Sequence, residues 1–407
     1  MTEQPKQGPL TGITVIDMTR VLGGPYATQT LGDYGAEIIK IEPPQGDEVR
    51  DWGPPFDAQH DSSYFLGVNR NKRSLGLDLS RPEGREVLLR LLEHADILIE
   101  NYKPGAMEKW GLGYAEVLQP RLPRLIHCRI SGFGADGPMG GAPGYDAVIQ
   151  GMVGMFSING TPETPDGGGG PTRMGIPLVD IGAGLYATIG LLMALIERQR
   201  SGLGQYIDMT LYDAGVALMH PHIPNYLLGG KLPQLTGNAH PNIAPYDRFA
   251  TKTVDVFLAI GNDRAFARLC TELGVPEMAD DPDYLTNADR CAHRPALTQR
   301  LRTLLAEQDG EALCARLLAA GVPAGPVRDV AQVWSDPHTQ HRAMAAEIGD
   351  YRGWGVPIKF SRTPGAIQRT PPRYGVHGRD ILAEHGFAED EIDKLASEGV
   401  LLEQRRR

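Results

Sequence analysis

The sequence has few cysteines, and their spacing excludes two classes of structure. The four cysteines are scattered along the chain, with no C-x-x-C pair and no dense cluster: Cys128, Cys270, Cys291 and Cys314. A structural metal centre and a disulfide framework both need cysteines at close, regular spacing. We therefore expect reduced thiols in a cytoplasmic compartment, and no metal site.

The sequence also lacks the glycine motifs that bind nucleotides. The turn at residues 20–35, RVLGGPYATQTLGDYG, contains no G-x-G-x-x-G, so the acidic Glu42 that follows does not complete a dinucleotide fingerprint. The run of four glycines at 167–170 is not followed by Lys-Ser or Lys-Thr, so it is not a phosphate-binding loop. The missing fingerprint excludes a nicotinamide-dependent dehydrogenase. The stretch 166–170 is interpreted as either a flexible insertion or a mobile lid.

Long apolar runs and excess positive charge are absent as well. The most apolar segment, Ile181–Ile196, contains three glycines and is shorter than the roughly 20 residues of a membrane span. The first ten residues, MTEQPKQGPL, lack the apolar segment of a secretory signal. The net charge of -10 over 407 residues argues against nucleic acid or an anionic membrane as a general partner.

Short apolar segments alternate with helix-like segments through the first part of the chain. A helix is expected over Tyr26–Tyr34 and another from Pro82, a typical first helical residue. Strands are expected at Ile13–Met18, Glu37–Glu42, Ser74–Leu79, Asp96–Glu100 and Leu125–Ile130. Repeated β-α-β units form right-handed parallel crossovers, which predicts an α/β fold with a Rossmann-like parallel sheet. Ligands bind at the carboxyl ends of such strands, which are followed here by the loops Val21–Pro25, Asn101–Pro104 and Ser131–Tyr145.

A second, smaller α+β domain is expected within the later part of the chain. A stretch rich in Gly, Pro and Asn around residues 227–249 predicts the crossing into it, and the segment 321–327 predicts the return. The expected division is a large domain at 1–224, a small domain at 225–325, and a return to the large domain with a C-terminal tail at 326–407.

One carboxylate occupies a position that favours chemistry. Asp180 follows a strand-like run, Arg173–Val179, and precedes Ile181–Ile196, which predicts a buried helix with Asp180 at its N-terminus. The free N–H groups and the dipole of a first helical turn favour negative charge, so we expect an ionised carboxylate at neutral pH. Such a group is a nucleophile towards an activated acyl carbon. Asp is also a preferred N-cap residue, and a purely structural cap is the alternative that these residues leave open.

Six segments carry a resemblance, in this order: VIDMTRVLGGPYATQTLGDYGAEIIKIEPP, NRNKRSLGLDLSRPEG, ENYKPGAMEKWGLGY, ISGFGADGPMGGAPGYD, PTRMGIPLVDIGAG and SGLGQYIDMTLYDA. Together they resemble the family III CoA-transferases, the CaiB/BaiF group to which formyl-CoA transferase belongs. The resemblance runs from about Leu10 to Gly237 and returns more weakly over Gly321–Arg362. The basic run Asn69–Arg73 within it could assist phosphate binding, but such a run is more often just a solvated loop, and it is not counted in the expected site.

The resemblance implies a role for each matching residue. Asp180 matches the family's catalytic aspartate. The positions that match coenzyme A contacts are Val21, Leu22, Leu77, Asp78, Leu79, Ser80, Asn101, Tyr102, Lys103, Lys109, Ala142, Pro143, Gly144 and Tyr145. The loop that closes over the site in formyl-CoA transferases matches Gly237, Asn238, Ala239 and His240, without that loop's run of glycines, so oxalate or formate specificity is not carried over. The resemblance also implies an interlocked homodimer.

The chemistry that the resemblance implies is transfer of CoA from an acyl-CoA to a short carboxylic acid. Asp180 attacks the thioester to give a mixed anhydride, the released thiolate returns to give an aspartyl-CoA thioester, and the acceptor acid attacks in turn. Backbone N–H groups of the 237–240 loop are the expected oxyanion donors. Succinyl-CoA is the first expected donor, and coenzyme A enters as part of the substrate.

Two alternatives belong to other functional classes. An α-methylacyl-CoA racemase needs a second acid/base group opposite Asp180, and racemases carry His where this sequence has Tyr145. A tyrosine hydroxyl, with an ordinary pKa near 10, is a poor base at neutral pH, which favours transfer. A non-catalytic CoA-binding protein of the same fold is the second alternative, and the intact motif around Asp180 argues against it.

Overall fold

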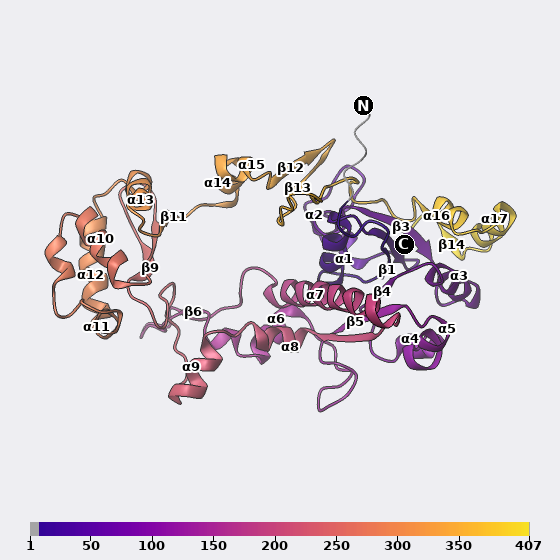
Figure 1. Cartoon of the computed structure of the whole chain (residues 1–407), viewed down its shortest axis with the longest axis horizontal. Helices are drawn as coiled ribbons and strands as arrows, with labels where there is room; N and C mark the ends of the chain where they lie inside the picture. The colour runs from indigo at the N-terminus through magenta and orange to yellow at the C-terminus, as the bar shows by residue number, and fades with distance from the viewer. Residues whose placement is uncertain (1–7, 407) are drawn as a thin grey trace. The chain divides into compact units, whose positions relative to one another are not determined.

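The computed structural model describes residues 8–406 of the chain (Figure 1). Residues 1–7, part of the segment in which no secretory signal is expected, and Arg407 lie outside the described residues. The chain forms two compact units. The first comprises residues 8–153, 175–220 and 340–406, and the second comprises residues 154–174 and 221–339. The segment 154–174 thus belongs to the second unit, although the sequence-based division placed it in the large domain.

A seven-stranded sheet forms the centre of the first unit within the described residues. Its strands are β1 (Thr14–Met18), β2 (Glu37–Glu42), β3 (Lys72–Leu77), β4 (Ile97–Glu100), β5 (Ile126–Ser131), β8 (Tyr206–Thr210) and β14 (Leu401–Leu402). Their order across the sheet is β14-β3-β2-β1-β4-β5-β8, and every pairing except that of β14 with β3 is parallel. The six parallel strands have the order 3-2-1-4-5-6 of a Rossmann sheet, which reverses between β1 and β4. The expected α/β fold with a parallel sheet is confirmed.

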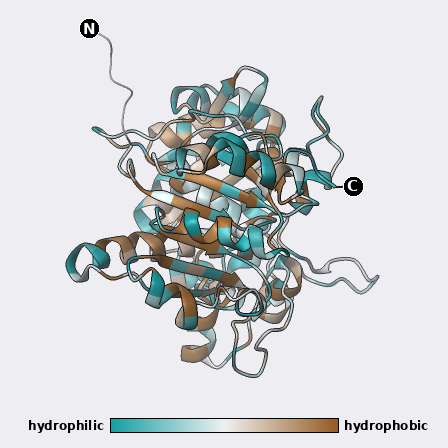
Figure 2. Ribbon diagram, turned by 90° about the vertical axis from the view of Figure 1, so that its right-hand side faces the viewer, coloured by the Kyte–Doolittle hydropathy of each residue, from teal (hydrophilic) through white to brown (hydrophobic). Residues whose placement is uncertain are grey.

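The strands are buried on both faces, as the runs of branched apolar residues predict. The side chains of Ile16 and Ile39 on β1 and β2 are fully buried, as are Leu75 on β3 and Leu98 on β4. They join a core with the apolar side of the helix that begins at Pro82, including Leu88. Figure 2 shows the brown, apolar strands of the sheet between helices that carry teal, polar residues.

Helices cover the sheet and connect its strands. They are α1 (Gly23–Asp33), α2 (Ser63–Gly67), α3 (Pro82–Leu92), α4 (Ala106–Lys109), α5 (Gln119–Arg121), α6 (Asp146–Met152), α7 (Leu178–Ser201), α8 (Leu211–Ala217), α16 (Gly378–Glu384) and α17 (Glu389–Ser397), with single turns η1 (Glu48–Asp51) and η2 (Tyr114–Leu118). The strand expected at Arg173–Val179 is wrong: residues 173–177 form no regular element, and α7 begins at Leu178. Gly175 and Pro177 interrupt that run, since both disfavour a strand interior.

Helix α7 packs closely against α1, because glycines lie at the crossing. A Cβ atom on Gly184 would lie 2.5 Å from the carbonyl oxygen of Gly23, and a Cβ atom on Gly23 would lie 3.1 Å from the carbonyl oxygen of Asp180. Residues larger than glycine would separate the two backbones. By length and composition α7 is apolar enough to cross a membrane, with mean hydropathy 1.9, but half of that window is buried within the fold against neighbours that include α1 and α8. This is typical of a core helix.

The end of the chain returns to the first unit. The strand β14 pairs with the edge strand β3, and α16 packs beside it, as the yellow segments next to β3 show in Figure 1. A hairpin of β12 (Ala345–Ile348) and β13 (Tyr351–Trp354) precedes them. The return to the large domain agrees with the expected division, whereas β14 was not expected from the sequence.

The basic run Asn69–Arg73 is buried, so the expected solvated loop is wrong. Arg70 and Lys72 are fully buried, and each pairs with a carboxylate: Arg70 with Asp33 at 2.6 Å, and Lys72 with Asp17 at 3.0 Å. Buried charges persist only when they are paired in this way. These cations hold the sheet together and are not available to a phosphate.

The second unit contains a small antiparallel sheet and a set of helices. Its elements are η3 (Met155–Ser157), β6 (Gly160–Thr161), β7 (Gly170–Pro171), α9 (His222–Gly229), β9 (Tyr246–Phe249), β10 (Val256–Ala259), α10 (Asp263–Glu272), η4 (Pro276–Ala279), α11 (Asn287–Ala292), α12 (Arg294–Leu305), α13 (Gly310–Ala319), β11 (Ala324–Pro326) and α14 (Val330–Ser335), with α15 (Pro337–His341) at its boundary. The strand order β11-β10-β9 is antiparallel throughout. Phe249, Phe266 and Leu301 lie in its own apolar core.

Candidate active site

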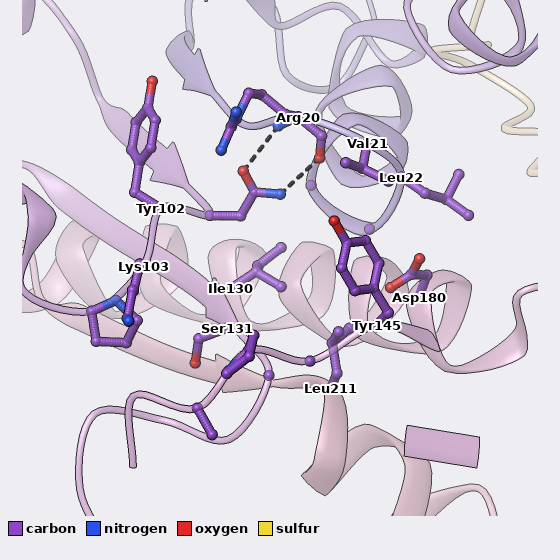
Figure 3. A pocket seen from close by; sticks show the side chains of 18 of the residues that line it. Arg20, Val21, Leu22, Tyr102, Lys103, Ile130, Ser131, Tyr145, Asp180 and Leu211 are labelled. Carbon is purple, nitrogen blue, oxygen red and sulfur yellow. Dashed lines mark hydrogen bonds between the residues drawn. The ribbon is translucent and has the colours of Figure 1, made fainter. Parts of the chain in front are cut away.

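A cavity of about 240 Å³ opens at the carboxyl ends of the central strands of the first unit (Figure 3). It lies where the strand order reverses, between the loops that follow β1 and β4, as expected for a sheet of this topology. The residues that line it are Arg20, Val21, Leu22, Gly23, Gly24, Glu48, Asn101, Tyr102, Lys103, Pro104, Ile130, Ser131, Gly132, Ala142, Pro143, Gly144, Tyr145, Asp180 and Leu211.

The loop after β1 is fixed in place by side chains from three neighbouring segments. The amide of Asn101 bonds the backbone of Arg20 on both sides, accepting from its N–H at 2.9 Å and donating to its carbonyl at 2.7 Å, and Figure 3 shows this pair of bonds. The ammonium of Lys40 donates to the Thr19 carbonyl at 2.8 Å, and a carboxylate oxygen of Asp47 accepts from the Val21 N–H at 3.3 Å. Val21 has φ 69°, which is rare for a β-branched residue. The surrounding bonds hold this conformation.

The ionic cluster beneath this loop consists of Asp17, Lys40, Asp47 and Lys72, all fully buried. Lys40 pairs with Asp47, and Lys72 with Asp17, at 3.0 Å in both cases. Burial alone would raise the pKa of Asp17, but Lys72, Lys40 and the hydroxyls of two threonines outweigh it and lower that pKa to about 2. Asp17 therefore stays ionised at neutral pH, and burial lowers the pKa of Lys72 to about 8, so the Lys72–Asp17 pair is charged at pH 7. The paired cluster gives the loop a rigid base.

Asp180 lies in the first turn of α7, as expected, but its ionisation differs from the expectation. Pro177 caps the helix and Asp180 is its third residue, partly buried and directed into the cavity. Burial, and after it the negative charge of Asp146, raise the pKa of Asp180 to about 7. The prediction that the helix N-terminus keeps this carboxylate ionised at neutral pH is therefore wrong. At pH 7 about half of it is protonated.

Asp146 adds to the effect of burial, because it is the residue that accepts hydrogen bonds from the free N–H groups of this first turn. One of its carboxylate oxygens accepts from the N–H groups of Val179 at 2.8 Å and Asp180 at 3.3 Å, and the other accepts from the side chain of Gln150 at 2.6 Å. The N–H groups that would stabilise a charged Asp180 are already bonded. Asp146 thus positions the turn that carries Asp180 and disfavours its charge.

The cavity brings together one part of the expected coenzyme A site and not the other. The residues that line it from that set are Val21, Leu22, Asn101, Tyr102, Lys103, Ala142, Pro143, Gly144 and Tyr145. Leu77, Asp78, Leu79, Ser80 and Lys109 lie outside its lining. The side chains of Leu77 and Leu79 belong to the apolar core, so only their backbone is available to a ligand. For these outer residues contact with coenzyme A stays a prediction.

The loop expected to contact the acceptor acid lies in the second unit. Gly237 donates its N–H to the Gly160 carbonyl at 2.9 Å, which joins this loop to the segment that carries the glycine stretch 166–170. The ring of His240 packs near that of Tyr246 and accepts from the Asn242 N–H at 3.0 Å. Burial, and after it the charge of Arg294, lower the pKa of His240, so it is neutral at pH 7. The role of Gly237, Asn238, Ala239 and His240 stays a prediction.

The sequence analysis missed two residues of this site. Asp146 is the last residue of the segment that contains Tyr145, but its contact with Asp180 spans 34 residues and no local pattern predicts it. Arg20 precedes Val21 in the loop after β1, and a charged residue between polar and apolar neighbours there is ordinary in sequence. Its place beside Asn101 becomes visible only when β1 and β4 pair.

The chain is similar over nearly its whole length to proteins of known family and structure. The sequence model of CoA-transferase family III matches residues 10–378. The succinate–glutarate CoA-transferase of Agrobacterium fabrum is 40% identical over 396 residues, covering 94% of this chain and 98% of that protein. The succinyl-CoA:glutarate CoA-transferase of Mus musculus is 37% identical over 400 residues, covering 97% and 90%. A crystal structure of a CaiB/BaiF family protein from Brucella suis has a TM-score of 0.83 and 41% identity, covering 93% of this chain and 100% of that chain.

Proposed function

Because the chain belongs to CoA-transferase family III, we propose that it moves CoA from succinyl-CoA to a short dicarboxylic acid through a covalent intermediate on Asp180. It is a CoA-transferase, and its substrates are therefore a CoA thioester and a carboxylic acid. The donor and the acceptor are proposed from its relatives, because both proteins compared above act between succinate and glutarate. The observation that carries the proposal is that Asp180 is directed into the cavity between the loops after β1 and β4.

The proposed reaction uses the carboxylate of Asp180 once as a nucleophile and once as a leaving group, and between these steps its carbonyl carbon is attacked twice. Its carboxylate attacks the thioester carbonyl of succinyl-CoA, which forms a mixed anhydride and releases the CoA thiolate. The thiolate attacks the aspartyl carbonyl of that anhydride, which gives the aspartyl-CoA thioester and frees succinate. The acceptor carboxylate then displaces the thiolate from Asp180, and the thiolate attacks the acceptor half of the new anhydride to give the product thioester and regenerate Asp180. No net proton or electron is consumed.

The ionisation of Asp180 suits this cycle. A carboxylate held by strong hydrogen bonds or by a cation would be a weak nucleophile and a stable leaving group. Among residues 8–406 no hydrogen bond to the carboxylate oxygens of Asp180 and no ion pair is recorded, so the group is poised near its pKa of about 7 and is reactive once ionised. The charge that acts on it comes from Asp146, on the helix beside it. Burial, and after it the charge of Asp180, raise the pKa of Tyr64 to about 12.

The experiment that tests the proposal is intact-protein mass spectrometry with a panel of acyl-CoA donors and hydroxylamine trapping. Wild type, Asp180→Asn and the exposed control Asp213→Asn are compared. We expect a CoA-sized adduct or a hydroxamate on Asp180 with succinyl-CoA, in wild type and control only. An adduct on another residue, or turnover by Asp180→Asn, would overturn the proposal. Exchange of an α-proton without an adduct would indicate racemase chemistry, and tight binding without turnover would indicate a CoA-binding protein.

We also propose that the enzyme works as an interlocked homodimer in the cytoplasm. One face of α7 carries large apolar side chains that the described part of the chain leaves uncovered: Leu185, Tyr186, Ile189, Met193 and Ile196, which are 40–64% exposed. A stripe of this kind marks an interaction site, and a second copy of the chain is the proposed partner that covers it. The proposed location in the cytoplasm is a separate point, which the four free cysteines support because free thiols are typical of a reducing compartment. Sedimentation should give twice the mass of 44.2 kDa, and Met193→Glu should lower it; a monomer in wild type would contradict the proposal.

A further inference from the structure

Arg20 is the less exposed of the two basic residues that line the cavity, and within the described part of the chain its side chain has no acidic partner. Its backbone is clamped by Asn101 at 2.9 Å and 2.7 Å, so the side chain starts from a fixed point. Among residues 8–406 its guanidinium makes no ion pair and no hydrogen bond, and its Nε is buried without an acceptor. A buried charged donor without an acceptor is costly, which indicates that a ligand supplies one.

The ring of Tyr102 fixes the direction of this guanidinium. The guanidinium carbon lies over the Tyr102 ring, 5.4 Å from its centre, and Figure 3 shows the two side chains on the same side of the cavity. Stacking on an aromatic face holds the planar fork of an arginine while leaving its N–H groups free at the edge. Arg20 lines the cavity, so a ligand there can accept from this guanidinium, whose planar fork matches the two oxygens of a carboxylate.

The second basic residue that lines the cavity is more exposed than Arg20. Lys103 also lines it but is exposed, and an ammonium acts as a point charge without the directed fork of a guanidinium. Lys103 therefore suits a phosphate near the mouth, whereas Arg20 suits a carboxylate within. Glu48 is the other acidic residue of the lining besides Asp180, and no ion pair between it and Arg20 is recorded in the described part of the chain.

We infer that Arg20 binds the distal carboxylate of the acyl group and of the acceptor acid, and so sets the preference for dicarboxylic over monocarboxylic substrates. This inference rests on the proposed function, since it names the residue that selects the substrate class for the same site. The far carboxylate is the only feature that distinguishes succinyl-CoA from butyryl-CoA, and a site built to pair with an ionised group discriminates strongly against a substrate that lacks it.

The test compares succinyl-CoA with butyryl-CoA as donors, and glutarate with valerate as acceptors, by kcat/KM in wild type, Arg20→Gln and Arg20→Lys. Arg121→Gln, a substitution on the exposed surface, is the control. We expect Arg20→Gln to lose 10- to 100-fold with succinyl-CoA and with glutarate, mainly through KM, and less than threefold with the monocarboxylic partners. Arg20→Lys should recover part of the preference. Thermal unfolding of each variant confirms that the fold is kept.

Two results would overturn the inference. An equal loss with both donors, accompanied by weaker inhibition by free CoA, would place Arg20 on a phosphate of coenzyme A. An unchanged preference for succinyl-CoA in Arg20→Gln would show that Arg20 does not select the substrate. The proposed function is judged separately in the same experiment, because it fails if wild type does not turn over succinyl-CoA at all.

Discussion

Asp17 at the end of β1 and Asp180 in the first turn of α7 are both sheltered from water, but their partners differ. Asp17 lies between Lys72 and Lys40 and accepts from the hydroxyls of Thr19 and Thr28, whereas the nearest charge to Asp180 is another carboxylate. The pKa of Asp17 falls to about 2, and that of Asp180 rises to about 7. Burial raises the pKa of both carboxyls. At Asp17 two cations and two hydroxyl donors outweigh burial, whereas at Asp180 burial is the main cause of the raised pKa and the charge of Asp146 adds to it.

The two regions have complementary tasks. The cluster around Asp17 stays ionised and holds the loop Thr19–Val21, which forms one wall of the cavity. The turn around Asp180 presents a carboxylate that is easily ionised but not stabilised, which suits a group that must form and break covalent bonds. One region contributes rigidity and the other reactivity.

The largest effect is expected from Asp180→Asn. An amide cannot replace the carboxylate nucleophile, so we expect kcat for succinyl-CoA to fall by about 10³-fold or more. The control Asp213→Asn removes a charge from the exposed first turn of α8 and should keep full activity. Steady-state assays of CoA transfer measure both, and residual activity above one tenth of wild type in Asp180→Asn would refute the covalent role.

The next largest effect is expected in the ionic cluster. Lys72→Met leaves Asp17 buried with one cation fewer, which should lower the free energy of unfolding by about 3–5 kcal/mol. Arg121→Met breaks an exposed pair with Glu93 and should cost less than about 1 kcal/mol. Urea unfolding at pH 7 measures both values. An equal decrease in the free energy of unfolding in the two variants would show that the buried cluster stabilises the fold no more than an exposed ion pair does.

Asp180 should also make the protein less stable as the pH rises. Its folded pKa of about 7 exceeds the unfolded value of 3.8, so the native state holds the extra proton between these values. The stability falls as the pH rises from about 4 to 7, by about 4 kcal/mol at about 1.4 kcal/mol for each pH unit, and is not regained above pH 7. Asp180→Asn should therefore be more stable than wild type at pH 8 and similar at pH 4, unlike Asp213→Asn. Urea titrations at the two pH values check this difference.

A smaller effect is expected at the crossing of α1 and α7. Gly184→Ala adds a methyl group 2.5 Å from the Gly23 carbonyl, which should separate the helices and cost about 1–3 kcal/mol. Gly190→Ala, in the same helix, places its methyl group 3.6 Å from Ile207 and should be neutral or slightly stabilising. Thermal melts distinguish the two. A stable Gly184→Ala enzyme with full activity would show that the close approach of α1 and α7 is not needed to position Asp180.

Sequence reasoning reached the parts of the molecule that depend on local patterns. The strands β1, β2, β4 and β5, the helix that begins at Pro82 and the long helix α7 follow from apolar periodicity and turn residues. It failed where distant segments meet. The run Asn69–Arg73 resembles a surface loop until β3 enters the sheet beside Asp17 and Asp33, and β14 is two residues long, too short to be recognised without its partner β3.

The candidate site shows the same division. Asp180 and its place in a first helical turn are predictable from the residues around it. Its ionisation is not, because that depends on Asp146, which reaches the turn from a different helix. Local rules predict that the acid nearest in sequence, Asp180, interacts with the free N–H groups of the first helical turn. In the structure Asp146 accepts hydrogen bonds from these groups.

The most direct test of this account is the pH dependence of covalent adduct formation in a single turnover, in wild type and Asp146→Asn. Asparagine keeps an oxygen that accepts from the Val179 and Asp180 N–H groups but removes the neighbouring charge. In wild type the rate of hydroxylamine-trappable adduct formation from succinyl-CoA should rise with pH and level off above about 7. In Asp146→Asn the same rise should occur about one pH unit lower, since one pH unit corresponds to about 1.4 kcal/mol of lost repulsion. An unshifted profile, or an adduct that forms equally fast at pH 5 and pH 8 in wild type, would contradict the claim that Asp180 is the nucleophile poised by Asp146.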